Sequence, residues 1–78
     1  MPRFYLHLYD DLVVKDEDGI FLADADEAWR EAVRSARSII AEQALKGRIN
    51  LKHWIDIVDE NGEPVLTVPF SSAVSVES

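Results

Sequence analysis

The fold is decided by residues 24–47, DADEAWREAVRSARSIIAEQALKG. Asp24 can accept a hydrogen bond from the first free N–H groups of a helix, and Glu27, three residues later, completes a capping box. Gly47 can take the left-handed conformation that ends a helix. We therefore predict one helix of about 22 residues, roughly 33 Å long at about 1.5 Å per residue.

One side of this predicted helix is apolar. At about 100° per residue, the small and apolar side chains gather in one stripe. The stripe contains Ala25, Ala28, Trp29, Ala32, Ala36, Ile39, Ile40 and Gln43. The alanines would let the helix lie close to a sheet, and we expect Trp29 to be a main apolar anchor together with Ile39 and Ile40. If Trp29 were fully buried, truncating it to alanine would cost about 3–5 kcal/mol.

Before the helix, residues 3–10 alternate between two sets of apolar and aromatic side chains with a period of two, which predicts a strand. Residues 12–14 and 20–22 are short apolar runs on either side of the loop KDEDG, residues 15–19. We expect these two runs to pair with each other as a hairpin, with Gly19 in the left-handed position after a type I turn.

After the helix, residues 53–59 and 64–70 predict a second hairpin around the loop DENGE. Pro64 and Pro69 lack N–H donors, which favours an edge position for the last strand. The element order is therefore β-β-β-α-β-β, or β-β-α-β-β if the early strands merge. We predict a single α+β domain over residues 1–78, with one long helix packed on a small antiparallel sheet of four to five strands.

The composition argues against several classes of function. The chain has 15 acidic and 8 basic residues, a formal net charge of −7, which disfavours nucleic acid and anionic membranes because phosphate binding depends on Lys and Arg. Its apolar runs are shorter than the roughly 18–20 residues of a membrane span. The first ten residues do not resemble a signal peptide, and without cysteine no disulfide is available. We expect a cytoplasmic protein.

One helix covers one face of a sheet, so we expect the second face to remain open. The strand alternation turns one set of side chains away from the helix: Tyr5, His7, Tyr9, Trp54, Val58, Val65 and Thr67. An exposed aromatic surface of this kind typically marks a protein interface or a homo-oligomer contact. The alternative is that the C-terminal tail or the early hairpin covers it. A base-stacking role is disfavoured because a basic surround is missing.

Charged residues suggest two further surfaces. Arg30, Arg34 and Arg37 lie at i, i+4 and i+7 on the exposed side of the helix, where Glu27 and Glu31 can pair with them. A solvated, salt-bridged helix face is the expected outcome, and a ridge for an acidic partner or phosphate is the alternative. The first third of the chain is acidic, which turns and a helix cap explain, although an acidic patch for a basic protein is also consistent.

Neither a metal nor a cofactor is predicted. Both acidic loops fail the spacing of an EF-hand, since the positions that must supply the first and last ligands are apolar. His7 and His53 are the only imidazoles, whereas zinc needs three or four ligands. A small enzyme that uses His7 with Asp56 is conceivable if their strands pair, but no nucleophile or oxyanion hole accompanies them.

The opening MPRFYLHL resembles that of a family of small uncharacterised bacterial proteins, which begin with an MPRYFFHL-like strand. The resemblance continues through the acidic loop before Gly19, the helix segment EAVRSAR at residues 31–37, and the closing VLTVPF at residues 65–70. Leu6 interrupts the aromatic run of that family. The family is a domain of unknown function, so the resemblance implies a bacterial source and one coherent fold, and no activity.

A looser similarity is to HicB-type antitoxins, in which a strand and an Asp-Gly hairpin also lead into an Ala- and Glu-rich helix. The chain lacks their DNA-binding module, so this resemblance implies only a half that binds a basic toxin. Our expectation is a non-enzymatic module that self-associates or binds a protein partner through the open sheet face.

Overall fold

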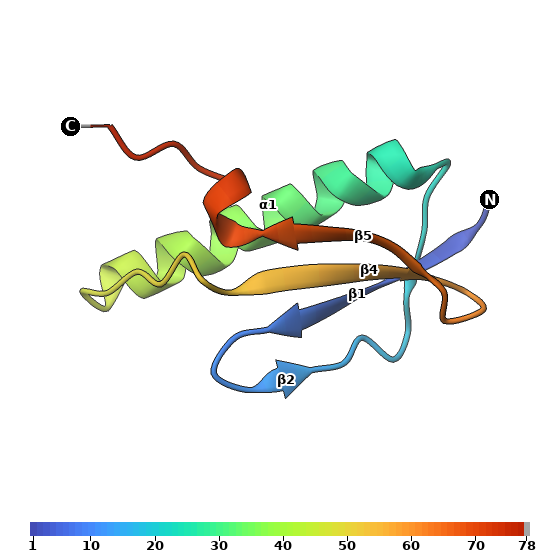
Figure 1. The fold of residues 1–78 in the computed structure, drawn as a ribbon, viewed down its shortest axis with the longest axis horizontal. Helices are drawn as coiled ribbons and strands as arrows, with labels where there is room; N and C mark the ends of the chain where they lie inside the picture. The colour runs from blue at the N-terminus through green and yellow to red at the C-terminus, as the bar shows by residue number, and fades with distance from the viewer. Residues whose placement is uncertain (78) are drawn as a thin grey trace.

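The helix α1 runs from Ala25 to Leu45 and lies against one face of an antiparallel sheet (Figure 1). The Asp24 carboxylate accepts a hydrogen bond from the Glu27 N–H at 2.9 Å, and the Glu27 carboxylate accepts one from the N–H that precedes the cap at 2.6 Å. Gly47 has a φ of 87°, the left-handed conformation that stops the helix. The predicted helix and the signals at both of its ends are confirmed.

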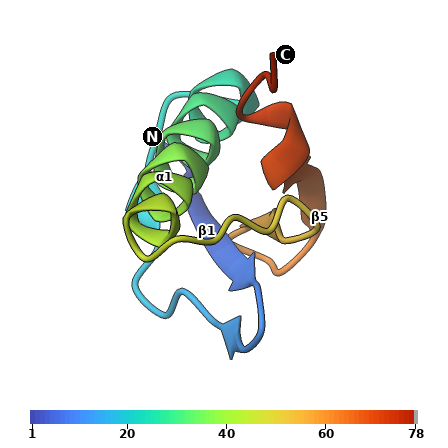
Figure 2. The ribbon, with the colours of Figure 1, turned by 90° about the vertical axis from the view of Figure 1, so that its left-hand side faces the viewer.

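Three strands of six or seven residues form most of the sheet: β1 (Arg3–Tyr9), β4 (Trp54–Asp59) and β5 (Pro64–Pro69). β4 lies between β1 and β5 and is antiparallel to both. The chain then forms a short 3₁₀ helix, η1 (Phe70–Ser72), beside α1 (Figure 2). The computed structural model describes residues 1–77. The predicted second hairpin and the edge position of its last strand are confirmed.

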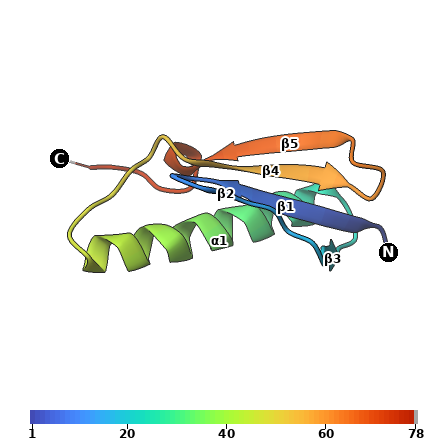
Figure 3. The same cartoon turned by 90° about the horizontal axis from the view of Figure 1, so that it is seen from below.

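The two early strands do not pair with each other. β2 (Val13–Val14) pairs with the end of β1 at Leu8 and Tyr9, and β3 (Ile20–Phe21) pairs with its start at Arg3 and Phe4 (Figure 3). The predicted hairpin is therefore wrong, because both runs lie along the same edge of β1 as one interrupted strand. The fold is α+β with five strands in the order β-β-β-α-β-β.

The side chain of Asp16 fills the gap in this interrupted strand. Its Oδ2 accepts a hydrogen bond from the Leu6 N–H at 3.2 Å, and its own N–H donates to His7 Nδ1 at 3.0 Å. Its Oδ1 accepts hydrogen bonds from the N–H groups of Gly19 at 3.0 Å and Asp18 at 3.3 Å. Asp16 thus gives β1 the acceptor that the backbone of a continuous neighbouring strand would supply.

The core lies between α1 and the sheet, and η1 closes one end of it. Its side chains are less than 9% exposed: Phe4, Ala28, Ala32, Val33, Ala36, Ile40, Ile55, Ile57, Val68, Phe70 and Ala73. Ala28, Ala32 and Ala36 are completely buried, so small side chains form the contact between α1 and the sheet, as predicted. Trp29 is 41% exposed, and its predicted role as a core anchor is wrong. A step of about 100° from the buried Ala28 turns its indole to the rim of the helix.

A bulge changes the direction of side chains in β5. Ile57 pairs with Leu66 but the next residue, Val58, pairs with Pro64, so Val65 has no partner of its own. Such an extra residue shifts the alternation of the bulged strand. Val65 packs against the core and Leu66 is 42% exposed, the reverse of the predicted alternation at these two positions.

Candidate interaction surface

The sheet face opposite α1 carries three cross-strand rows of side chains, which we call the open face. Tyr9 lies opposite Trp54, His7 lies opposite Asp56, and Tyr5 lies opposite Val58. Thr67 of β5 extends the middle row beyond Asp56. The open face thus contains Tyr5, His7, Tyr9, Trp54, Asp56, Val58 and Thr67.

A stacked aromatic pair forms one end of the open face. The rings of Tyr9 and Trp54 are nearly parallel, with 4° between their planes and 5.2 Å between their centroids. Lys15 Nζ lies 3.0 Å from the Tyr9 hydroxyl and 5.3 Å from the centre of its ring. Trp54 nevertheless stays 39% exposed. Lys15 thus holds the aromatic pair in place from the sheet edge, while the Trp54 indole remains accessible.

The middle row contains the candidate catalytic pair, His7 and Asp56. The sheet register brings the two residues directly opposite each other, but their side chains are engaged elsewhere. His7 Nδ1 accepts the hydrogen bond from the Asp16 N–H, which places the proton of the neutral ring on Nε2. Asp56 Oδ1 accepts a hydrogen bond from the Thr67 hydroxyl at 2.9 Å. These contacts give the two residues structural roles.

Tyr5 forms the other end of the open face. Its ring stacks on that of His7 at 6.4 Å with 24° between the planes. Arg3 Nη1 lies 3.4 Å from the Tyr5 hydroxyl, and this hydrogen bond raises the pKa of the Arg3 guanidinium above its ordinary value. The Arg3 guanidinium also lies 4.6 Å from the centre of the Phe21 ring. Tyr5 and Tyr9 are thus each contacted by a cation at the rim of the face.

The C-terminal tail packs on the helix side of the sheet. Phe70 and Ala73 are buried in the core, and the Ala73 carbonyl accepts a hydrogen bond from Arg37 Nε at 2.6 Å. Figure 3 shows α1 and the open face on opposite sides of the sheet. Within residues 1–77, therefore, the tail does not cross the open face, and β2 and β3 flank it along one edge.

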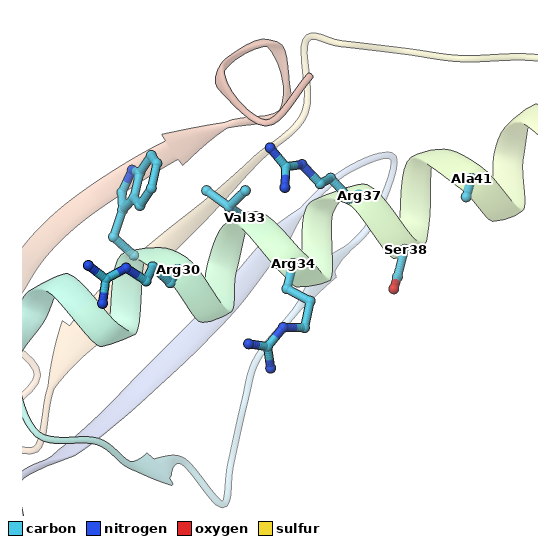
Figure 4. Close-up of a pocket in the computed structure, with 7 residues that line it drawn as sticks. Arg30, Val33, Arg34, Arg37, Ser38 and Ala41 are labelled. Carbon is cyan, nitrogen blue, oxygen red and sulfur yellow. The ribbon is translucent and has the colours of Figure 1, made fainter. Parts of the chain in front are cut away.

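The helix carries the second predicted surface. A shallow groove of about 540 Å³ runs along α1 and is lined by Trp29, Arg30, Val33, Arg34, Arg37, Ser38 and Ala41; we call it the arginine groove (Figure 4). Arg34 pairs with Glu31 at 2.9 Å, as predicted, whereas Arg30 pairs with Asp26 at 3.5 Å. Glu27 caps the helix instead of pairing with an arginine. The sequence placed the arginines on one exposed side but did not place Trp29 beside them.

A feature absent from the sequence-based prediction surrounds His53. This residue is only 7% exposed, and its ring contacts the edge of Phe70 with 5.6 Å between centroids. Its Nε2 lies 3.6 Å from Asp11 Oδ1, while its buried Nδ1 has no hydrogen-bond partner among the described residues. A groove of about 310 Å³ beside it is lined by Asp11, Gln43, Arg48, Ile49, Asn50 and His53. The sequence predicted a strand start at His53, and the alternation that places it on the same side as Ile55 and Ile57 is the signal for its burial.

Residues 1–77 contain neither a cluster of metal-binding side chains nor a membrane-spanning helix. No three or more His, Asp or Glu side chains of this part of the chain come together in a way that would hold a metal ion. None of its helices combines the length and apolarity needed to cross a membrane.

Comparison with known proteins gives one match. No curated protein and no solved structure matches the chain. The model of a domain of unknown function, DUF6894, matches residues 3–71. These residues include all five strands and α1, so the match covers the whole sheet together with the helix that packs on it. The chain therefore belongs to the DUF6894 family, which confirms the resemblance to an uncharacterised domain family.

Proposed function

We propose that this domain is a non-enzymatic interaction module that binds a basic protein partner through the open face. The observation that carries the proposal is the Tyr9–Trp54 stack, an ordered aromatic surface that leaves Trp54 39% exposed outside the core. Tyrosine and tryptophan are enriched among the residues that dominate binding energy, because they bury a large area with little loss of side-chain freedom.

Charge favours a basic partner over a second copy at this face. Asp56 lies in its middle row, Asp16 lies at its edge beside His7, and Asp10 follows Tyr9. Together with the chain's net charge of −7, these carboxylates outweigh Arg3 and Lys15 at the rim. Two copies docked face to face would bring like charges together, which opposes association. A partner rich in Lys and Arg would instead be attracted before contact, and its cationic side chains can stack on exposed tryptophan. A basic toxin, as the antitoxin resemblance implies, is one protein of this kind.

Selection from a displayed library of random peptides tests the choice of partner. We expect wild-type protein to enrich peptides that combine Arg or Lys with apolar residues, and the Tyr9→Ser/Trp54→Ser variant to lose this enrichment. Trp29→Ser is the matched control, because Trp29 is exposed to a similar extent, 41%, and lies on α1, on the other side of the sheet. Enrichment that is equal in wild type and in the double variant would refute the proposal.

Sedimentation equilibrium separates this proposal from a face-to-face dimer. The proposal predicts that any self-association of the wild type is unaffected by the Tyr5→Ser/Trp54→Ser substitutions. If the wild type dimerises and this double variant does not, a second copy of the chain occupies the open face, and the basic partner is wrong.

A further inference from the structure

We infer that the arginine groove of one chain receives the acidic loop, residues 10–18, of a second copy. The loop reads DDLVVKDED and combines carboxylates with an apolar run, whereas the groove combines guanidinium groups with an indole. The two surfaces are thus complementary in charge and in apolar character. The loop borders the open face, since Val13 pairs with Tyr9 and Lys15 contacts the Tyr9 hydroxyl, so the contact involves the rim of that face and not Trp54.

The groove side has arginines that are available to a partner. The ion pairs of Arg30 and Arg34 are on the surface, where the two arginine side chains are 66% and 74% exposed, and surface pairs of this kind contribute little to stability. Arg37 is held by the Ala73 carbonyl through Nε, which fixes its stem against η1. Trp29, which lines the same groove, is 41% exposed. The groove therefore offers both cations and an uncovered apolar ring.

On the other side of the contact, the loop contains an apolar run that residues 1–77 leave more than half exposed. Leu12 is 74% exposed, Val13 56% and Val14 52%. Asp11 precedes this run and Glu17 and Asp18 follow it, all of them exposed. Adjacent exposed aliphatic side chains bordered by charge are typical of a contact surface, because burying them against another protein is favourable.

The topology prevents one chain from satisfying its own groove. β2, which the loop contains, lies at one edge of the sheet, and β5 with η1 lies at the other (Figure 1). The arginine groove adjoins η1, since the stem of Arg37 is fixed to Ala73. The contact must therefore join different surfaces of two copies, a head-to-tail arrangement that extends into a ring or a chain of molecules.

The net charge of −7 does not exclude this association. At physiological ionic strength the Debye length is about 8 Å, so charges farther apart than this are largely screened. Within that range the arginines of one copy meet the carboxylates of the next.

Charge reversal in pairs tests this inference by sedimentation velocity. One variant, Arg30→Glu/Arg34→Glu, reverses the charge of the groove. The other, Asp11→Lys/Glu17→Lys/Asp18→Lys, changes the formal charge of residues 10–18 from −4 to +2 and leaves the hydrogen-bonded Asp16 intact. We expect wild type to associate with increasing concentration and each variant alone to associate at least about tenfold more weakly. An equimolar mixture of the two variants should recover association, because the acidic groove of the first fits the basic loop of the second, and the native arginine groove of the second fits the native acidic loop of the first. The assembly should therefore contain both variants in equal amounts.

Three results would overturn the inference: a wild type that stays monomeric at millimolar concentration, single variants that associate as well as wild type, or a mixture that remains monomeric. Thermal unfolding of each variant, followed by circular dichroism, verifies that the folded monomer is being compared. The Tyr5→Ser/Trp54→Ser variant, which leaves the contact of Lys15 with Tyr9 in place, should associate like wild type, so failure of the groove contact and failure of the proposed function give different results.

Discussion

The two faces of the sheet differ although the same strands build both. In β4, Ile55 and Ile57 are 3% and 0% exposed and pack under α1, whereas Trp54 and Val58 alternate with them on the open face. The buried side chains that the strands contribute to the covered face, Phe4, Ile55, Ile57 and Val68, have no polar atoms. The open face combines aromatic rings with an imidazole, a carboxylate and a hydroxyl, several of them hydrogen-bonded to one another or to the rim. This difference is the basis of our proposal that one face supplies the stability of the fold and the other supplies recognition.

The largest effect on stability should come from removing volume on the covered face. Ile57→Ala should lower the free energy of unfolding by about 2–5 kcal/mol, because it leaves a cavity in a fully buried site. Val58→Ala is the matched control, one residue later on the same strand but on the open face, and should cost about 1 kcal/mol or less. Urea denaturation measures both. Equal losses would contradict the assignment of separate roles to the two faces.

Adding volume to the covered face should have the next largest effect. Ala32 is completely buried where α1 meets the sheet, so Ala32→Leu should destabilise the domain by about 1–3 kcal/mol through overpacking. Ala44→Leu adds the same atoms at an exposed position near the end of α1 and should be nearly neutral. A neutral Ala32→Leu would show that the helix can move away from the sheet and that the close contact is not essential.

The next largest effect on stability should come from Asp16, at the sheet edge beside β1. Asp16→Ala removes the acceptor for the N–H groups of Leu6 and Gly19 and should cost about 1–2 kcal/mol, as expected for hydrogen bonds to a charged group that is partly exposed. Glu17→Ala changes the adjacent exposed acid and should leave stability unchanged. Amide hydrogen exchange at Leu6 gives the local readout, with faster exchange expected only in the Asp16 variant.

The sequence predicted the helix and the second hairpin because their determinants are local. Asp24, Glu27 and Gly47 act within one turn of the helix ends, and the loop between β4 and β5 joins neighbouring strands. The pairing of β2 and β3 with β1 was mispredicted because it depends on the Asp16 carboxylate reaching Leu6, a contact between residues ten positions apart. In the sequence, residues 12–14 and 20–22 also satisfy the pattern of an ordinary hairpin.

The sequence also predicted part of the candidate interaction surface. Alternation in β1 and β4 correctly separated Tyr5, His7, Tyr9 and Trp54 from the core, because the period of a strand is fixed. It failed at Val65, where a bulge inserts one residue, because no residue of β5 predicts a bulge. Trp29 was misplaced for a related reason: it lies at the border of the core, where a small rotation decides between burial and exposure.

The smallest effect on stability should come from the open face itself. Trp54→Ser should cost about 1 kcal/mol or less, mainly the stacking on Tyr9, because the indole is already partly in water. The same substitution should abolish binding of the peptides selected by the wild type. A loss of stability comparable to that of Ile57→Ala would assign Trp54 to the core.

Quenching of tryptophan fluorescence by acrylamide tests the central claim most directly. In a Trp29→Phe variant, Trp54 is the only tryptophan, so the emission reports the open face alone. An uncovered face predicts efficient quenching of Trp54 in the free protein at micromolar concentration and strong protection when a selected basic peptide is added. Protection of Trp54 in the free protein, to the degree seen for a core residue, would show that the face is already covered and would contradict the account.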